Sequence, residues 1–566
     1  MFASYLEYWG KMRLATILCV SLALNFWGIN WGLPVIWHPD EITQRAMTMF
    51  DSRTLNHHHF AYGPLHNYQV ILFAVLPAKT LNKFVYLDNT TQQTIVIVLS
   101  RVLSALLGTG VVLLIYLLAK ELFNSKAALF SSLLLTTSMG FVNLSHFATT
   151  DMPWIFWFTF SCLMSTYALI YKTRKWYILS GLFSGFAAAV KYIGGVALVT
   201  LVVAHFLSKE RKNNANLAIG VLMALIGFLV AYPVVIFSFF EFAEGFIKEN
   251  FFNSARDANE PYAFLPLVFE LRNALGVPLC LLVIAGILYS LILFASKESR
   301  GKVLLVWSMI FPHHIVMGSM HVSSLHYVVP IIPVLLILTG KMVSDFTSSN
   351  LKAGRIVSMV LVGIVLSYSL IYTIAADLEF TNDSRYLVYN WISRNVKERS
   401  KIEIAIDAPN ILNDDRYTVI RRPVHPNVDE TASSTRNNST YLSLQAMISK
   451  LKSVAGNGEK PYIAWWERAK DRHQIESSKF DLSIEGLESR KPDYLVVNVY
   501  YADRFLHDKS SVEGQFFDSL FSGKTSYKKV AEFRYRFFSW IDPEVEFVNP
   551  IIYVYRADSL SHKLIK

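Results

Sequence analysis

Two adjacent carboxylates, Asp40 and Glu41, stand directly after the first long apolar run of the chain. Removing carboxylates from water beside a membrane costs free energy, so a simple spacer would rarely keep two of them there. The preceding Pro39 fixes φ and can begin a helix, whose first turn favours acidic side chains through its free N–H groups and dipole. These residues alone therefore leave two interpretations open: capping of a surface helix, and acid–base chemistry at the membrane surface.

Three further polar residues stand at turns between apolar segments. Asp151 precedes Pro153, where it is either a first-turn acid of the next helix or a second catalytic carboxylate. Lys191 interrupts an apolar stretch and is a functional candidate unless it only extends to the membrane interface. His326 stands at the start of another apolar run, where a lone histidine more often packs than reacts.

Metal and disulfide chemistry have weaker support in the sequence. The run His57-His58-His59 could bind a metal, but adjacent side chains point in different directions, which favours a solvated loop. The three cysteines all fall in apolar runs, so we expect no disulfide framework and no zinc-type cysteine cluster.

The composition is that of a polytopic membrane protein. The chain has 566 residues, of which 53% are hydrophobic, and its mean hydropathy is +0.34. Its net charge of +10 would suggest nucleic acid as a partner of a soluble protein. Here basic connectors on the cytoplasmic side account for much of that charge, so no nucleic acid is expected. The absence of a glycine-rich phosphate loop from the sequence leaves ATP-driven transport without support.

The hydropathy pattern predicts about eleven transmembrane helices. They are expected near residues 14–33, 96–119, 127–146, 153–172, 177–190, 192–208, 215–236, 276–296, 302–319, 328–345 and 355–375. Every second connector is basic, which places the N-terminus in the cytoplasm. An odd number of spans then places the C-terminal part outside the cytoplasm, on the same face as all the candidate residues. Carboxylates, a lysine and a histidine on one membrane face suit a substrate with an anionic head and an apolar tail.

Two domains are expected. Residues 1–375 form the transmembrane domain, whose first outer loop, 34–95, contains an interfacial helix near Tyr68–Ala78. A second long outer connector, Phe237–Arg272, is a candidate lid. Residues 376–566 form an extracytoplasmic α/β domain. In this domain we expect a helix at Ser384–Arg399, strands at Lys401–Ala408, Tyr494–Tyr500 and Ile551–Tyr555, and loops over 409–460.

In their order along the chain, these motifs resemble those of the GT-C class of integral-membrane glycosyltransferases. The nearest groups are the protein O-mannosyltransferases and the bacterial transferases that put aminoarabinose on lipid A. The resemblance covers roughly residues 10–375. Tyr62-Gly63-Pro64-Leu65 stands where the family has a Lys-Pro-Pro-Leu element, and lacks its lysine. The other matching elements are Asp40-Glu41, Asp151-Met152-Pro153, Lys191, and His326-Tyr327-Val328-Val329-Pro330, which has His where the family has Arg.

The resemblance implies transfer of a sugar from a polyprenyl phosphate to a hydroxyl of a glycan, lipid or protein, with inversion at the anomeric carbon. Asp40 would be the general base, and Glu41 and Asp151 would orient the sugar or acceptor. Lys191, then His326, with Tyr62, would bind the donor phosphate. Some relatives use a divalent metal, but the sequence fixes no ligand set. The alternative functions are a transporter or flippase of lipid-linked glycans and a membrane scaffold.

Overall fold

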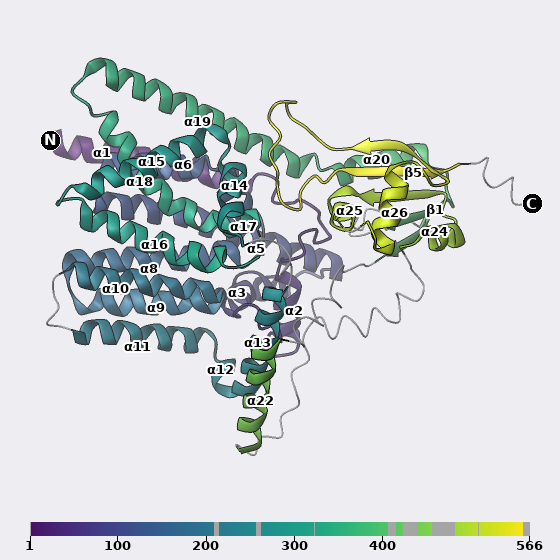
Figure 1. Cartoon of the computed structure of the whole chain (residues 1–566), viewed down its shortest axis with the longest axis horizontal. Helices are drawn as coiled ribbons and strands as arrows, with labels where there is room; N and C mark the ends of the chain where they lie inside the picture. The colour runs from purple at the N-terminus through teal and green to yellow at the C-terminus, as the bar shows by residue number, and fades with distance from the viewer. Residues whose placement is uncertain are drawn as a thin grey trace, which may run out of the picture. The chain divides into compact units, whose positions relative to one another are not determined.

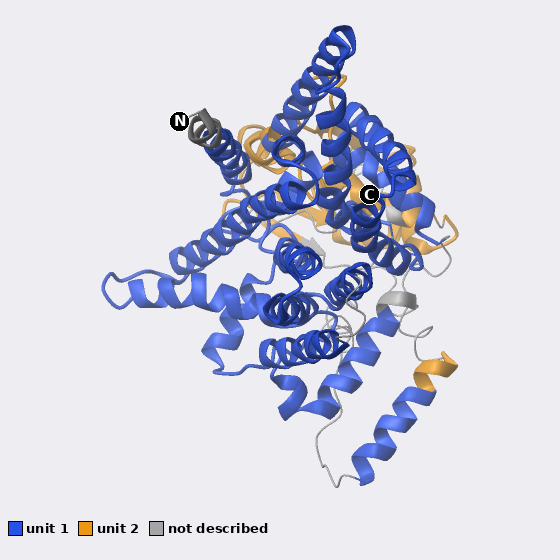
Figure 2. Ribbon diagram, turned by 90° about the vertical axis from the view of Figure 1, so that its left-hand side faces the viewer, with its two compact units in different colours: residues 1–377, 443–461 blue, residues 378–442, 462–566 orange. Residues whose placement is uncertain are grey.

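The computed structural model describes residues 2–208, 214–255, 262–321, 323–405, 415–422, 438–454, 482–507 and 509–558. Figure 1 shows the helices and strands in chain order, and the chain divides into two compact units, coloured separately in Figure 2. Unit 1 comprises Met1–Asp377 and Ser443–Pro461, and unit 2 comprises Leu378–Leu442 and Tyr462–Lys566. Unit 1 is helical, whereas the sheet lies in unit 2.

The described part of unit 1 begins with α1 and continues as a series of long helices joined by shorter ones. The N-terminal series is α1 (Phe2–Phe26), α2 (Thr43–Asp51), α3 (Leu65–Val70), η1 (Ile71–Val75), α4 (Leu76–Leu81), α5 (Asn89–Leu122), α6 (Ser125–Thr136), α7 (Met139–Ser145), α8 (Asp151–Tyr171), α9 (Arg174–Val190), η2 (Tyr192–Val196) and α10 (Ala197–Leu207). The remaining series is α11 (Asn214–Ala231), α12 (Val234–Phe237), α13 (Phe239–Ala255), α14 (Phe264–Leu275), α15 (Val277–Ala295), α16 (Arg300–Gly318), α17 (Leu325–Val328), η3 (Val329–Ile331), α18 (Ile332–Phe346), α19 (Lys352–Thr381) and α22 (Ser439–Val454).

Helices occupy the expected spans. Among the described residues, six helices are long and apolar enough to cross a membrane, and a seventh span is counted if the bent pair α6 and α7 forms one. The helices α6 and α7 are bent by 66° relative to each other. The apolar helices are those of a multi-pass integral membrane protein. The count of eleven spans stays a prediction.

Unit 2 is built on a five-stranded mixed sheet in the order β2-β1-β3-β5-β4. The parallel part contains β2 (Thr418–Arg422), β1 (Lys401–Ala405) and β3 (Tyr494–Asn498), while β5 (Ile552–Ala557) runs antiparallel to β3 and to β4 (Tyr527–Phe533). Its described helices are α20 (Ser384–Asn395), α24 (Ile484–Arg490), α25 (Val499–Leu506) and α26 (Val512–Phe521).

Both faces of this sheet are covered. Successive side chains of a strand point to opposite faces. On β3, Val496 packs in the core cluster that includes Ile392 of α20, whereas Leu495 and Val497 pack in the cluster that includes Phe516 of α26. The nearly continuous apolar run of β3 is what a strand buried on both faces requires.

The predicted elements of the C-terminal part are found with different bounds, and the expectation of loops throughout 409–460 was wrong. The expected helix ends at Asn395, and β1 ends within the described residues at Ala405. Within the expected loop region, 409–460, the described residues contain the strand β2 and the helix α22. The polar residues of α22 on one side hid an apolar pattern on the other. Residues 406–414, 423–437 and 455–481 lie outside the described residues.

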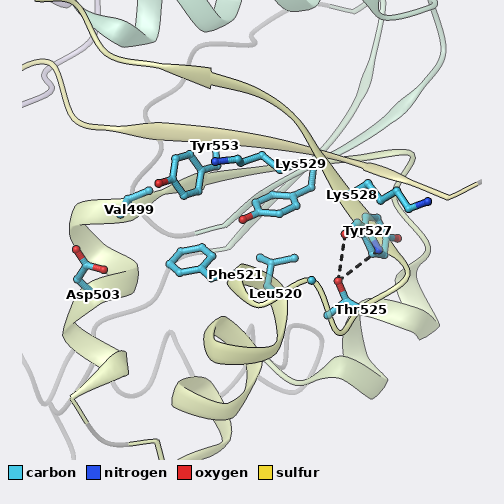
Figure 3. A pocket seen from close by; sticks show the side chains of 11 residues that line it. Val499, Asp503, Leu520, Phe521, Thr525, Tyr527, Lys528, Lys529 and Tyr553 are labelled. Carbon is cyan, nitrogen blue, oxygen red and sulfur yellow. Dashed lines mark hydrogen bonds between the residues drawn. The ribbon is translucent and has the colours of Figure 1, made fainter.

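A cavity of about 420 Å³ opens in unit 2 where α25 and α26 meet the last two strands (Figure 3). Its aromatic lining includes Phe521 and Tyr553, whose ring centroids are 5.6 Å apart. Lys529 Nζ lies 4.1 Å from the Tyr553 ring centroid and forms an exposed ion pair with Glu532 (2.9 Å). The cavity therefore lies between the helices α25 and α26 and the β5–β4 edge of the sheet.

Candidate functional site

Glu41 belongs to a buried ion pair that ties three segments together. Its two carboxylate oxygens accept hydrogen bonds from Arg101 Nε (2.8 Å) and Nη2 (3.0 Å), and Oε1 also accepts one from the Ala148 N–H (3.0 Å). The Arg101 guanidinium, in turn, donates to the carbonyls of Ile29 (3.0 Å) and Trp31 (2.6 Å). Burial raises the pKa of the Glu41 carboxyl, but the guanidinium outweighs it and holds that pKa below its ordinary value. Glu41 thus fixes the loop after α1 to α5 and to the turn before α8.

Sequence reasoning missed Arg101, although a signal was present. Arg101 is a cation inside α5, a 34-residue helix that is strongly apolar between its polar first turns and its C-terminal end. A charged side chain within such a helix is costly unless it has a partner inside the bundle. The side chain of Arg101 is only 1% exposed, so its partner had to come from another segment.

Asp40 has the opposite environment to its neighbour. Its side chain is exposed, while Glu41 is buried. The Asp40 backbone N–H donates to His38 Nδ1 (3.1 Å), and the His38 ring packs against Phe147 at 4.4 Å between centroids. The loop therefore presents the Asp40 carboxylate to solvent from a backbone held by buried groups on both sides.

Asp151 and Lys191 form a second ion pair, between the start of α8 and the turn after α9. The distance from Lys191 Nζ to Asp151 Oδ1 is 2.8 Å, and the side chains are only 15% and 9% exposed, respectively. Burial lowers the pKa of Lys191, but the Asp151 charge outweighs it, and that pKa is raised above its ordinary value. Lys191 therefore remains a cation and points to a carboxylate rather than to water.

Two tyrosines flank this cation. Lys191 Nζ lies 5.6 Å from the Tyr62 ring centroid and 5.5 Å from the Tyr327 ring centroid, both within the range of cation–π attraction. Burial raises the pKa of Tyr62; the Asp40 charge adds to this, and Lys191 opposes it. Asp40 and Lys191 thus both act electrostatically on the same phenol.

His326 belongs to the same group of residues. It lies on α17 next to Tyr327, and their ring centroids are 4.1 Å apart. Its Nδ1 lies 3.0 Å from the Ser324 hydroxyl, and its ring is an electrostatic neighbour of Asp151. The structure therefore gathers Tyr62, Asp151, Lys191 and His326, with Asp40 at their edge and Glu41 behind.

The loop that carries Tyr62 is held against the turn that carries Lys191. The Gly63 N–H donates to the Val190 carbonyl (3.2 Å), and the Tyr192 hydroxyl donates to the Phe60 carbonyl (3.0 Å). A Cβ at position 63 would lie 2.0 Å from the Ala189 carbonyl oxygen. Only glycine allows this approach, which sets the distance between Tyr62 and Lys191.

The histidine run was expected to be solvated, but only His58 is exposed, and His58 and His59 contact acidic side chains of α13. His57 is buried and its Nε2 donates to the Tyr62 carbonyl (2.9 Å); burial lowers the pKa of His57 to about 3. His58 Nδ1 lies 2.9 Å from Glu241, and His59 Nδ1 lies 3.4 Å from Glu249. Within the described residues, no group of three or more His, Cys, Asp or Glu side chains could hold a metal.

The expected lid contains two described helices, α13 and α14. Arg256, Asp257 and Glu260, which contribute to its mixed charge, lie outside the described residues. The acidic side chains of α13 bind the first outer loop, because Glu249 accepts a hydrogen bond from the Ala61 N–H (2.6 Å). This connector therefore supports the loop of Tyr62.

Comparison with known proteins gives one family match and several similar folds. Residues 92–237 match the family model described as dolichyl-phosphate-mannose-protein mannosyltransferase. A relative from Aquifex aeolicus, described as an uncharacterized protein, is 27% identical over 290 residues, which cover 50% of this chain and 54% of the relative. The chain thus spans about half the length of that relative.

Two solved structures resemble this fold along most of the chain. The oligosaccharyltransferase of Archaeoglobus fulgidus in its apo form has 12% identity and a TM-score of 0.50, over 95% of this chain and 75% of that chain. ArnT from Cupriavidus metallidurans bound to undecaprenyl phosphate has 16% identity and a TM-score of 0.49, over 96% and 98%. With the family match, the archaeal fold confirms the resemblance predicted from the sequence.

Proposed function

We propose, from the resemblance of this chain to the GT-C class of integral-membrane glycosyltransferases, that it moves one sugar from a polyprenyl phosphate to an acceptor hydroxyl. The acceptor is a glycan, a lipid or a protein, and the reaction takes place on the extracytoplasmic face of the membrane. The observation that carries the proposal is the exposed Asp40 carboxylate together with the Lys191–Asp151 ion pair, since Asp40 and Lys191 both act electrostatically on Tyr62.

Asp40 is the general base in this proposal. It takes the proton of the acceptor hydroxyl as the hydroxyl oxygen forms a bond to the anomeric carbon. The bond between that carbon and the phosphate oxygen breaks, and polyprenyl phosphate leaves with the electron pair. One attack from the face opposite the phosphate inverts the anomeric centre. A positioned base of this kind typically contributes about 10²–10⁴-fold in rate.

The leaving phosphate needs cations rather than an acid. Lys191 is a permanent cation in a site where little water reaches it, and charge stabilisation is stronger there than in bulk water. The Tyr62 phenol lies against this cation, and the His326 imidazole lies next to Tyr327, the second ring that flanks it. These three side chains form the phosphate site in this proposal.

Glu41 and Asp151 support the neighbouring groups. Glu41 is engaged by Arg101 and Ala148, so it fixes the backbone that presents Asp40. Asp151 fixes Lys191 at 2.8 Å and contributes to substrate orientation through this contact. In this proposal, Glu41 and Asp151 orient the sugar and acceptor indirectly, because they fix the positions of Asp40 and Lys191.

The test is acceptor-dependent release of undecaprenyl phosphate by the purified full chain in lipid nanodiscs. A panel of labelled undecaprenyl-phosphate sugars is offered with glycan, lipid and peptide acceptors. We expect turnover with one donor class and its loss in Asp40→Asn. Asp51→Asn is the matched control, because Asp51 is an exposed carboxylate at the end of α2 that pairs only with Lys79 in the described contacts (2.9 Å). Transbilayer movement of intact donor without sugar release would instead support a flippase.

A further inference from the structure

Helix α22 returns from the C-terminal part of the sequence to unit 1 and is attached to α13. Residues Ser443–Pro461 belong to unit 1, and Lys452 Nζ lies 3.0 Å from Glu244 Oε2 on α13. Ile448, one helical turn before Lys452, is buried. These two residues define the inner face of α22.

An apolar stripe, Met447, Leu451 and Val454, follows the neighbouring side of α22. These side chains are 52%, 48% and 80% exposed, respectively. Their spacing of four and three residues places them in one row along the helix. Lys450, which is also exposed, borders the row. A soluble surface rarely leaves such a row in water, so a partner is expected.

The surroundings identify that partner. The candidate span α11 ends at Ala231, and α12 and α13 follow at once with exposed Ile236 (59%), Phe237 (75%) and Phe239 (52%). These side chains therefore lie where the membrane-spanning helix leaves the bilayer. In both views of unit 1, α22 runs crosswise to the long helices and extends away from them (Figures 1 and 2). A helix crosswise to membrane-spanning helices lies parallel to the membrane plane.

We propose that α22, α12 and the start of α13 form an interfacial platform that rests on the lipid surface. The stripe Met447, Leu451 and Val454 enters the boundary between headgroups and acyl chains, and Lys450 extends to the lipid phosphates. A basic, amphipathic helix with a narrow apolar row is typical of this mode of binding. The proposal depends on the membrane character of unit 1 and not on the proposed glycosyl transfer.

The platform is connected to the candidate site through α13. Glu244 binds Lys452 of α22, and two further acids of α13 hold the first outer loop: Glu241 pairs with His58 (2.9 Å) and Glu249 accepts from the Ala61 N–H (2.6 Å). Tyr62 is the next residue of that loop. The lipid surface therefore supports the loop that faces Lys191.

The test uses nitroxide labels on the full chain in phosphatidylcholine–phosphatidylglycerol vesicles. Cys19→Ser removes the exposed cysteine, while Cys162 and Cys280 are buried. A label at Leu451→Cys is compared with a label at Ser449→Cys, an exposed position on a different side of α22. We expect the label at 451 to be relaxed several-fold more by oxygen than by a water-soluble nickel chelate, and the label at 449 to show the reverse.

Two results would overturn the proposal. Equal access of the nickel chelate to both labels would place the stripe in water. A label at 451 that neither reagent reaches, with dipolar broadening between labelled chains, would assign the stripe to a second copy of this chain. Met447→Cys repeats the measurement one turn away, so a local distortion at position 451 cannot decide the result.

Discussion

Asp40 and Glu41 share one peptide bond and have opposite environments. The first is exposed, and the second is buried against Arg101. The position of both residues at the membrane surface could be predicted, because they directly follow a long apolar run of the sequence. Which of the two is buried could not be predicted, because burial of Glu41 depends on Arg101 and Ala148, about 60 and 107 residues further along the chain.

This difference predicts distinct outcomes for two neighbouring substitutions. Asp40→Asn keeps the shape but removes the proton acceptor, so turnover should fall by about 10²–10⁴-fold while the thermal unfolding midpoint stays unchanged. Glu41→Gln leaves the buried guanidinium without a counter-charge, so it should destabilise the protein by about 3 kcal/mol. Sugar transfer and thermal unfolding are measured on both variants in the same detergent. Equal losses of stability in the two variants would contradict the assignment of a catalytic role to Asp40 and a structural role to Glu41.

Lys191 gives a second prediction at this scale. Lys191→Ala should weaken binding of undecaprenyl phosphate more than Lys191→Arg, because Arg retains a cation beside Asp151. The change also leaves the buried Asp151 carboxylate unpaired, so thermal unfolding is recorded alongside binding. Lys175→Ala is the control, since Lys175 is exposed and lies on a tryptophan ring. Equal affinity in the wild type and both Lys191 variants would limit the ion pair to a structural role.

His57 makes stability depend on pH. Its pKa is about 3 in the folded protein and about 6.5 in an unfolded chain, because the ring is buried. Between these values the unfolded state binds the extra proton, so stability falls as the pH drops below about 6.5. At pH 5 the loss is about 2 kcal/mol from this group.

The measurement is the unfolding midpoint from pH 7.5 to pH 5 for the wild type and for His57→Gln, whose amide can still donate to the Tyr62 carbonyl. The variant should lose less stability on acidification. Parallel profiles would show that His57 does not contribute to the acid sensitivity.

At the scale of elements, the candidate site depends on one close approach between two turns. Gly63→Ala would place a Cβ 2.0 Å from the Ala189 carbonyl oxygen, so the loop of Tyr62 must move away from Lys191. We expect donor affinity to fall by at least tenfold. Gly363→Ala in α19 is the control, because no atom of another described element lies within 4 Å of the place its Cβ would take, and alanine favours a helix. Unchanged donor binding in Gly63→Ala would show that the approach is not needed.

Element prediction succeeded where periodicity or hydropathy was strong. The strands β3 and β5 and helix α20 follow apolar patterns that are visible locally. α22 was missed because polar residues of the surrounding 409–460 region outweighed its apolar row. The docking of His58 and His59 on α13 was also missed, because their partners are more than 180 residues away and surface pairing leaves no local pattern.

For the whole molecule, the distribution of basic connectors makes a prediction about topology. A reporter fused after Lys566 should be active outside the cytoplasm, because alternate connectors are basic and the predicted number of spans is odd. Its partner experiment is a reporter fused after Lys175, in a connector expected to face the cytoplasm. If both reporters were active on the same side, the predicted number of spans or the predicted side of the candidate site would be wrong.

The ion pair between Glu41 and Arg101 has a consequence for biosynthesis. Arg101 lies inside the predicted span 96–119, and an arginine in a membrane helix raises the free energy of insertion, by up to about 2.5–3.5 kcal/mol at the helix centre. Glu41 leaves the ribosome before Arg101, and so do the carbonyls of Ile29 and Trp31 that the guanidinium also binds. Every side-chain and carbonyl partner described for Arg101 is therefore already translated when α5 reaches the translocon. The N-terminal segment can thus neutralise the arginine as the helix enters the bilayer, before the remainder of the bundle exists.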